Sequence, residues 1–203
     1  RGIPAQGPLP PGLFGNREGR EGINPYVYDW VYNAAQRKPL SEAKRLLAEA
    51  GYPHGVDAKT GAPLVLNFDV TAGGPDDKAR LDWYRKQFAK LDVQLVIRNT
   101  DYNRFQDKMA KGNAQIFFWG WNADYPDPEN FLFPLFHSSN HGPAGNRTRY
   151  INHTVDSLIE KGQSTSDEKK RNLLYRQAEE LIVEDSPWVF LWHRTDFTIR
   201  KPW

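Results

Sequence analysis

The chain has 203 residues and a mass of 23.4 kDa, a length that can bury about two-thirds of its unfolded surface in one or two compact units. Its net charge is +2, and its Lys and Arg residues are mixed with Asp and Glu, which argues against a nucleic-acid-binding surface. The lack of cysteine excludes disulfides, thiolate metal sites and a cysteine nucleophile, and no apolar run has the length of a membrane span.

The first 25 residues are rich in proline and glycine, which predicts an extended, irregular segment. The sequence opens with Arg1, and its only methionine is Met109. We therefore expect a processed or truncated piece of a longer protein.

The first helix is predicted from Ser41 to Ala50, because apolar residues recur there on one helical face. Ser41 can cap its start, and Gly51 stands where helices commonly close with a left-handed residue.

Strand and helix patterns then alternate along the chain. The predicted elements are a strand at 64–71, a helix behind Pro75 that reaches Leu91, a strand at 93–97, a helix at 102–109 between Asp101 and Gly112, and a buried strand at 116–121. Alternating β and α units favour a parallel sheet with right-handed crossovers, so the predicted fold class is α/β with helices flanking a mostly parallel sheet.

Three further helices are predicted at 129–136, 153–162 and 166–184. A capping box of Thr165 and Glu168 would start the last of them. After Pro187, residues 188–200 have the pattern of a final strand.

The loop at 121–128 is the most informative segment, because two prolines and two aspartates end the aromatic-rich strand before it. A carboxylate just past a buried strand lies where open α/β sheets bind ligands, which makes Asp124 the candidate ligand contact. The alternative is a turn residue that bonds its own backbone. Asp127, next to Pro128, is better explained as a helix cap. A hydrolytic pair of Asp124 and Asp127 is disfavoured because both lie in one loop.

Strand alternation would put Trp119 and Trp121 on one face, with Trp119 in the core and Trp121 at the edge of a ligand site. His137 and His141 have a metal-ligand spacing only in a helix, and the Ser- and Gly-rich sequence between and after them predicts surface histidines in a loop. His193, on the final strand, is a further candidate ligand contact. The sequence has no recognisable catalytic motif, which favours a binding protein without a metal or cofactor over an enzyme.

Several segments together resemble one family, the extracytoplasmic solute-binding proteins of bacterial ABC importers in the dipeptide/oligopeptide class (family 5). The matching segments, in the family's order, are residues 7–12 (Gly-Pro-Leu-Pro-Pro-Gly), 43–53, 120–128, 146–150 with Asn152 and Asp156, and 184–187. Residues 30–39 depart from the family pattern as an insertion.

The resemblance implies the C-terminal part of a protein with two α/β lobes of the type II periplasmic-binding-protein kind. Residues 1–39 would be the extended segment with the insertion, residues 40–186 the C-terminal lobe, and residues 187–203 the return strand toward a first lobe missing from this chain. The location implied is periplasmic or extracellular, either free or held at the cell surface by a lipid anchor.

The resemblance also implies a function, peptide capture for an importer whose membrane permease would be the partner. Asp124 would pair with the peptide's ammonium group, and Trp121, Asn122, Ala123 and Tyr125 would shape the wall of the site. An oligosaccharide or a metal chelate is the alternative ligand, the first because the aromatic content of 13% could serve sugar stacking. The remaining alternative is a glycoside hydrolase.

Overall fold

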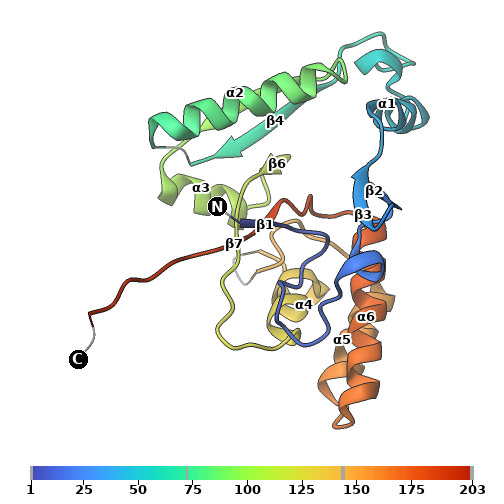
Figure 1. The fold of residues 1–203 in the computed structure, drawn as a ribbon. Helices are drawn as coiled ribbons and strands as arrows, with labels where there is room; N and C mark the ends of the chain where they lie inside the picture. Colours follow the sequence, from blue (N-terminus) through green and yellow to red (C-terminus); the bar gives the residue numbers. More distant parts are fainter. Residues whose placement is uncertain (1, 72, 143–144, 202–203) are drawn as a thin grey trace. The chain divides into compact units, whose positions relative to one another are not determined.

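The computed structural model describes residues 2–71, 73–142 and 145–201 (Figure 1). The chain divides into two compact units. The helical unit consists of two segments, Arg1–Arg37 and Trp121–Trp203. The sheet unit is the segment between them, Lys38–Gly120. These boundaries differ from the predicted segments 1–39, 40–186 and 187–203. The assignment of those segments to lobes of a whole protein stays a prediction.

A parallel three-stranded sheet organises the sheet unit. It consists of β4 (Val65–Val70), β5 (Gln94–Asn99) and β6 (Ile116–Phe117) in the order β5-β4-β6. The register runs from Val65 opposite Gln94 to Val70 opposite Asn99, and both neighbours pair parallel to β4. The predicted parallel sheet is confirmed.

The predicted strand at 116–121 is wrong in its length and its burial, because β6 has two half-buried residues. Beyond Phe117 the aromatic side chains diverge. Phe118 lies under the guanidinium of Arg80, 5.3 Å from its ring centroid, whereas the Trp119 ring packs edge-on against Phe105 at 5.1 Å. The alternation expected to place Trp119 and Trp121 on one strand face therefore does not apply.

Three helices belong to the sheet unit: α1 (Leu40–Glu49), α2 (Pro75–Ala89) and α3 (Tyr102–Ala110). The helix α2 lies along one face of β4 (Figure 1) and packs Leu81 against Phe68 and Val70. The predicted start of α3 after Asp101 is confirmed, and the Asp101 side chain caps the helix by accepting the N–H of Arg104 at 3.0 Å. A single turn of 3-10 helix follows α1 at Pro53–Gly55.

The helical unit is built from α4 (Glu129–Phe136), α5 (His153–Gln163) and α6 (Glu168–Asp185), within two residues of the predicted bounds. The helices α5 and α6 run side by side (Figure 1) and enclose the largest core cluster of the chain. Gly162 allows this close approach, because a Cβ atom there would overlap the ring of Tyr175. Short 3-10 helices lie at Gly19–Gly22 and Ser138–Asn140.

Two predicted helix caps are wrong. No side chain caps α1, which has Pro39 rather than Ser41 at its N-cap position. Asp167 caps α6 by accepting the N–H of Lys170 at 2.9 Å. The Thr165 hydroxyl instead donates to the carbonyl of Lys161 at 2.6 Å, so it completes the end of α5. Gly51 is confirmed as the left-handed residue after α1, with a φ of +92°.

The remaining strands are short. β1 (Gly2–Pro4) pairs antiparallel with β7 (Trp192–Arg194), so the predicted strand at 188–200 is far shorter than expected. The predicted insertion at 30–39 overlaps a hairpin of β2 (Tyr28–Val31) and β3 (Ala34–Arg37). Its two turn residues have φ angles of 49° and 59°, as the common two-residue hairpin turn requires.

Candidate ligand-anchoring loop

The loop at 121–128 begins the second segment of the helical unit and leads into α4. Trp121, at its start, packs against the core cluster of the helical unit. The next residues, from Asn122 through Pro126, are exposed. Four of the six predicted ligand contacts, Asn122 to Tyr125, are thus exposed and consecutive. A fifth, Trp121, precedes them and packs against the core.

The Asp124 carboxylate is available for a ligand. Its side chain is exposed and forms no hydrogen bond or ion pair with any other described residue. The backbone N–H of Asp124 donates to Oδ1 of Asn130 at 2.9 Å, so this turn is closed by a different side chain. The geometry does not fit the alternative in which the Asp124 carboxylate bonds its own backbone.

Asp127 has a structural position three residues later. Its Oδ1 accepts the N–H of Glu129 at 2.8 Å, and Arg171 on α6 donates to both carboxylate oxygens at 2.7 and 2.8 Å. Asp127 therefore bonds the start of α4 as predicted, from one residue before the N-cap position at Pro128.

The hydrogen bonds from Arg171 hold the pKa of Asp127 below its usual range. Arg171 already hydrogen-bonds both oxygens of Asp127, and Asp127 lies in the same loop as Asp124, whereas a hydrolytic pair flanks the scissile bond of its substrate. The observed geometry thus disfavours the hydrolase alternative.

Further contacts brace the exposed side of the loop. The Tyr125 hydroxyl donates to Glu129, whose other carboxylate oxygen accepts from Nε2 of Gln163 at 2.9 Å. Sequence reasoning missed Asn130, Gln163 and Arg171, because their partners lie up to 44 residues away. The only local signal was the polar Asn130 beside Glu129 in the first turn of a helix whose other residues are apolar.

Two indole N–H groups in the helical unit are buried without a hydrogen-bond partner among the described residues, those of Trp121 and Trp188. The Trp188 ring packs on Phe136 with a centroid distance of 5.2 Å. Both rings therefore serve core packing here, and a role of Trp121 in the wall of a ligand site stays a prediction.

His193 lies in β7, opposite Ile3 of β1. It is half-buried, and burial lowers the pKa of its imidazole, which keeps the ring neutral near pH 7. A neutral ring could donate or accept a single hydrogen bond. Its predicted contact with a ligand stays a prediction.

The prediction of surface histidines is wrong for His137, which is 6% exposed. Its Nδ1 accepts the N–H of Ser139 at 3.1 Å, and its Nε2 lies 3.3 Å from Glu160, so the ring caps the turn that follows α4. His141 is half-buried and bonds the carbonyl of Tyr150 at 3.0 Å. In the described part of the chain, no three His, Cys, Asp or Glu residues are grouped for a metal ion, and no helix could cross a membrane.

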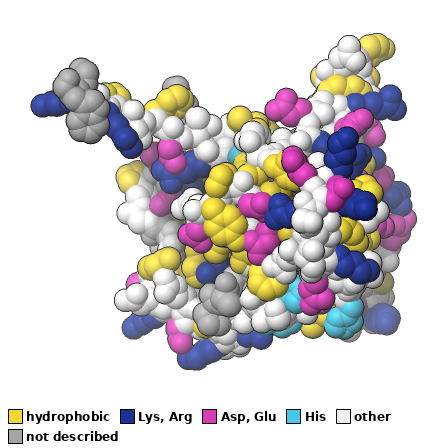
Figure 2. Space-filling model, turned by 90° about the horizontal axis from the view of Figure 1, so that it is seen from below, with side chains coloured by type: hydrophobic (Ala, Val, Ile, Leu, Met, Phe, Trp, Pro, Cys, Tyr) yellow, Lys and Arg dark blue, Asp and Glu magenta, His cyan; other side chains and the backbone are white. Residues whose placement is uncertain are grey.

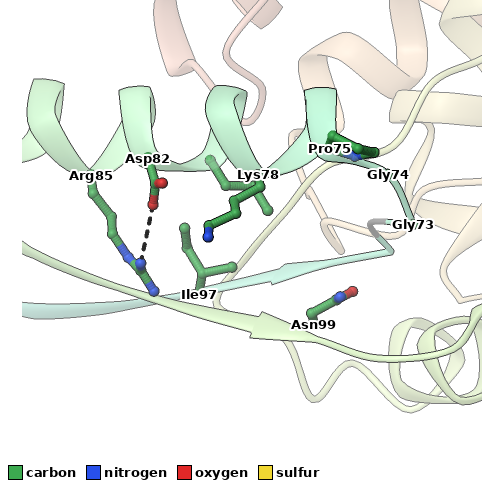
Figure 3. Close-up of a pocket in the computed structure, with 9 residues that line it drawn as sticks. Gly73, Gly74, Pro75, Lys78, Asp82, Arg85, Ile97 and Asn99 are labelled. Carbon is green, nitrogen blue, oxygen red and sulfur yellow. Dashed lines mark hydrogen bonds and ion pairs between the residues drawn. The ribbon is translucent and has the colours of Figure 1, made fainter.

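The sheet unit contains a groove of about 490 Å³ between α2 and β5 (Figure 3), which the sequence did not predict. Lys78 and Arg85 point into it from α2, and Ile97 and Asn99 line it from β5 (Figure 3). Arg85 is paired with Asp82 at 3.4 Å.

Charged side chains of both signs are interspersed on the face of the chain drawn in Figure 2, with apolar side chains exposed between them. This agrees with the net charge of +2. A nucleic-acid-binding surface would instead show clustered Lys and Arg.

The sequence profile described as "Bacterial extracellular solute-binding proteins, family 5 Middle" matches residues 1–143. Heme-binding protein A of Haemophilus influenzae is 28% identical over 99% of this chain, and the periplasmic oligopeptide-binding protein OppA of Escherichia coli is 27% identical over 99% of it. In both cases the match covers 34% of the relative. This chain thus spans about a third of the length of the curated relatives that it matches.

Among solved structures, the periplasmic binding protein DppA of Helicobacter pylori in complex with the peptide STSA superposes with a TM-score of 0.74. It is 25% identical, and the match covers 94% of this chain and 33% of that one. These similarities confirm the predicted fold class, a partial chain of the type II periplasmic-binding-protein-like α/β fold.

Proposed function

Because this chain belongs to the bacterial extracellular solute-binding proteins of family 5, we propose that it is part of the component that captures peptides for an ABC importer. Two observations support a peptide ligand: the relative named as an oligopeptide-binding protein, and the solved neighbour in complex with a peptide. The observation that carries the proposal is the exposed Asp124 carboxylate, which has no partner within the described chain.

In this proposal Asp124 pairs with the free ammonium group of the peptide. A carboxylate that becomes enclosed with an opposite charge forms a strong, directional pair, and it leaves an uncompensated charge when the partner is absent. Trp121, Asn122, Ala123 and Tyr125 form the wall around this end of the ligand. His193 supplies a neutral hydrogen-bonding group.

The proposed mechanism is closure of the whole protein around the peptide, in which the ligand shifts an open–closed equilibrium by binding the closed form better. The importer's permease would then recognise the closed form. The proposed location is the periplasm or the cell surface, where the binding protein can contact the permease.

Native mass spectrometry of the complete gene product, purified from its host without denaturation, tests the proposal. We expect peptides to co-purify with the unmodified protein and with Glu184→Gln, which removes an exposed carboxylate from α6. The Asp124→Asn protein should emerge without peptide. A preparation of unmodified protein that carries only non-peptide solutes would contradict the proposal.

The relative named heme-binding protein A supports a second candidate ligand, an iron porphyrin, which is a metal chelate. A porphyrin carries carboxylates instead of an ammonium group, so Asp124 would repel it at close range. An absorption band of bound heme in the purified protein, strengthened by Asp124→Asn, would favour this candidate over peptides.

A further inference from the structure

We propose that Asn130 is the positioning residue for the ligand anchor: it holds the Asp124 main chain so that the carboxylate faces the ligand. This inference rests on the proposed function. Asn130 is 6% exposed, and its Oδ1 accepts the N–H of Asp124 at 2.9 Å. A buried side chain that bonds the main chain of an exposed residue fixes that residue more firmly than contacts in the loop could.

Asn130 closes the loop at more than one point. Its backbone N–H donates to the carbonyl of Asp127 at 3.1 Å, in addition to the bond that its side chain accepts from the N–H of Asp124. Asn130 thus hydrogen-bonds the preceding loop twice, through its own side chain at Asp124 and through its own main chain at Asp127. The exposed carboxylate then projects from a turn with few alternative conformations.

The base of this turn is itself immobilised. Asn130 sits in the first turn of α4, directly before Phe131 and Leu132, which belong to the core cluster of the helical unit. The ion pair of Asp127 with Arg171 fixes the same helix start to α6. A displacement of Asn130 would have to disturb both.

The amide side chain suits this task for a chemical reason. Asn offers one acceptor and one donor group without a charge. An aspartate at 130 would keep the acceptor for the Asp124 N–H, but it would place a second negative charge beside the anchor. An alanine would leave the Asp124 N–H without its partner.

The test is a double-mutant cycle in the complete gene product, with Asp124→Asn, Asn130→Ala and the double variant. The probes are alanine peptides of two to five residues with free amino termini, and the same peptides after N-acetylation. We expect Asn130→Ala to weaken binding of the free peptides roughly fivefold, the effect of one hydrogen bond. It should leave the acetylated peptides unchanged and add nothing in the Asp124→Asn background.

The possible failures are distinguishable. If Asp124→Asn weakens binding and Asn130→Ala does not, the positioning role is wrong and the proposed function stands. Equal losses for free and acetylated peptides, or additive losses in the double variant, would show that Asn130 supports only the fold. If the unmodified protein binds none of the free peptides, the proposed function and this inference are both overturned.

A measurement on the unmodified protein tests the inference even if the Asn130→Ala variant does not fold. Amide hydrogen exchange at Asp124 should be slower than at the neighbouring exposed residue Ala123 by at least the roughly fivefold expected for the hydrogen bond. Equal exchange rates at the two positions would mean that Asn130 does not hold the loop, and would overturn the inference.

Discussion

The core cluster between the helices of the helical unit and the cluster between α2 and the sheet differ in how deeply most of their apolar side chains are buried. In the helical unit, core side chains such as Leu132, Ile159 and Ile182 have no exposed surface. In the sheet unit, the cluster between α2 and the sheet stays between 4% and 8% exposed. The loop with the proposed ligand anchor leads into α4, whose Leu132 belongs to the more deeply buried cluster.

The largest expected effect comes from an apolar truncation in the deeper core. Ile159→Ala should lower the free energy of unfolding by about 4 kcal/mol, because it leaves a cavity with no route for water. Leu81→Ala in the sheet unit should cost only about 2 kcal/mol, since its site is near solvent and can relax. Urea unfolding followed by tryptophan fluorescence measures both. Equal losses would remove the distinction between the two cores.

The second effect concerns an ion pair of the sheet unit in which the aspartate is buried and the lysine is partly exposed. Lys108 on α3 pairs with Asp69, whose second carboxylate oxygen is buried without a partner among the described residues. Lys108→Met should cost about 3 kcal/mol, because it leaves an uncompensated charge in the interior. Lys111→Met, which breaks the exposed pair with Asp107 on the same helix, is the control and should change stability very little. An unchanged free energy of unfolding for Lys108→Met would show that the stability of the sheet unit does not depend on the pairing of Asp69 with Lys108.

A third effect depends on pH and belongs to the helical unit. Burial against the N-terminal segment raises the pKa of Glu179 to about 7, an increase that Arg17 and the Leu9 N–H only partly offset. The neighbouring charges on α6 are Arg176 and Glu180.

Because the pKa in the folded state lies above the ordinary value of 4.5, Glu179 contributes stability that is complete below about pH 4.5 and lost as the pH rises through about 7. Melting temperatures from pH 4.5 to 8 should therefore fall less steeply for Glu179→Gln than for the unmodified chain. Glu180→Gln, which removes the exposed neighbour, should retain the slope. Identical slopes for all three proteins would refute this assignment.

The smallest effect is expected in the hairpin at 28–37. Tyr32 is 99% exposed and has a φ of 49°, a conformation that asparagine adopts more easily. Tyr32→Asn should leave the free energy of unfolding within about 0.5 kcal/mol of its original value, on the stabilising side. A loss above 1 kcal/mol in the same urea titration would mean that this ring makes a contact essential to the fold.

Local signals predicted the fold well. The three helices of the helical unit and the cap at Asp101 follow from apolar spacing and from side chains within three residues of their partners. The order of strands and helices in the sheet unit was equally readable. The end of β6 was not, because the divergence of Phe118 and Trp119 depends on Arg80 and Phe105, which are close only in the folded chain.

The candidate site was only partly readable for the same reason. The motif around Asp124 selected this residue as a ligand contact, which stays a prediction, and the expected strand before it ends early, at Phe117. The cap signal identified Asp127. The pairing of Asp127 with Arg171 spans 44 residues, and the burial of His137 depends on its capping of a turn that the sequence pattern assigned to an exposed loop. Asn130 was missed because a polar residue in the first turn of a mostly apolar helix does not reveal its hydrogen-bond partners.

The central claim is that Asp124 recognises a positive charge on the ligand. Isothermal titration of the complete gene product with alanine peptides, free and N-acetylated, tests it most directly. The account predicts that acetylation and Asp124→Asn each abolish most of the affinity, and that the two changes together cost little more than either one. Peptides that bind equally well with and without the acetyl group, to both proteins, would contradict it.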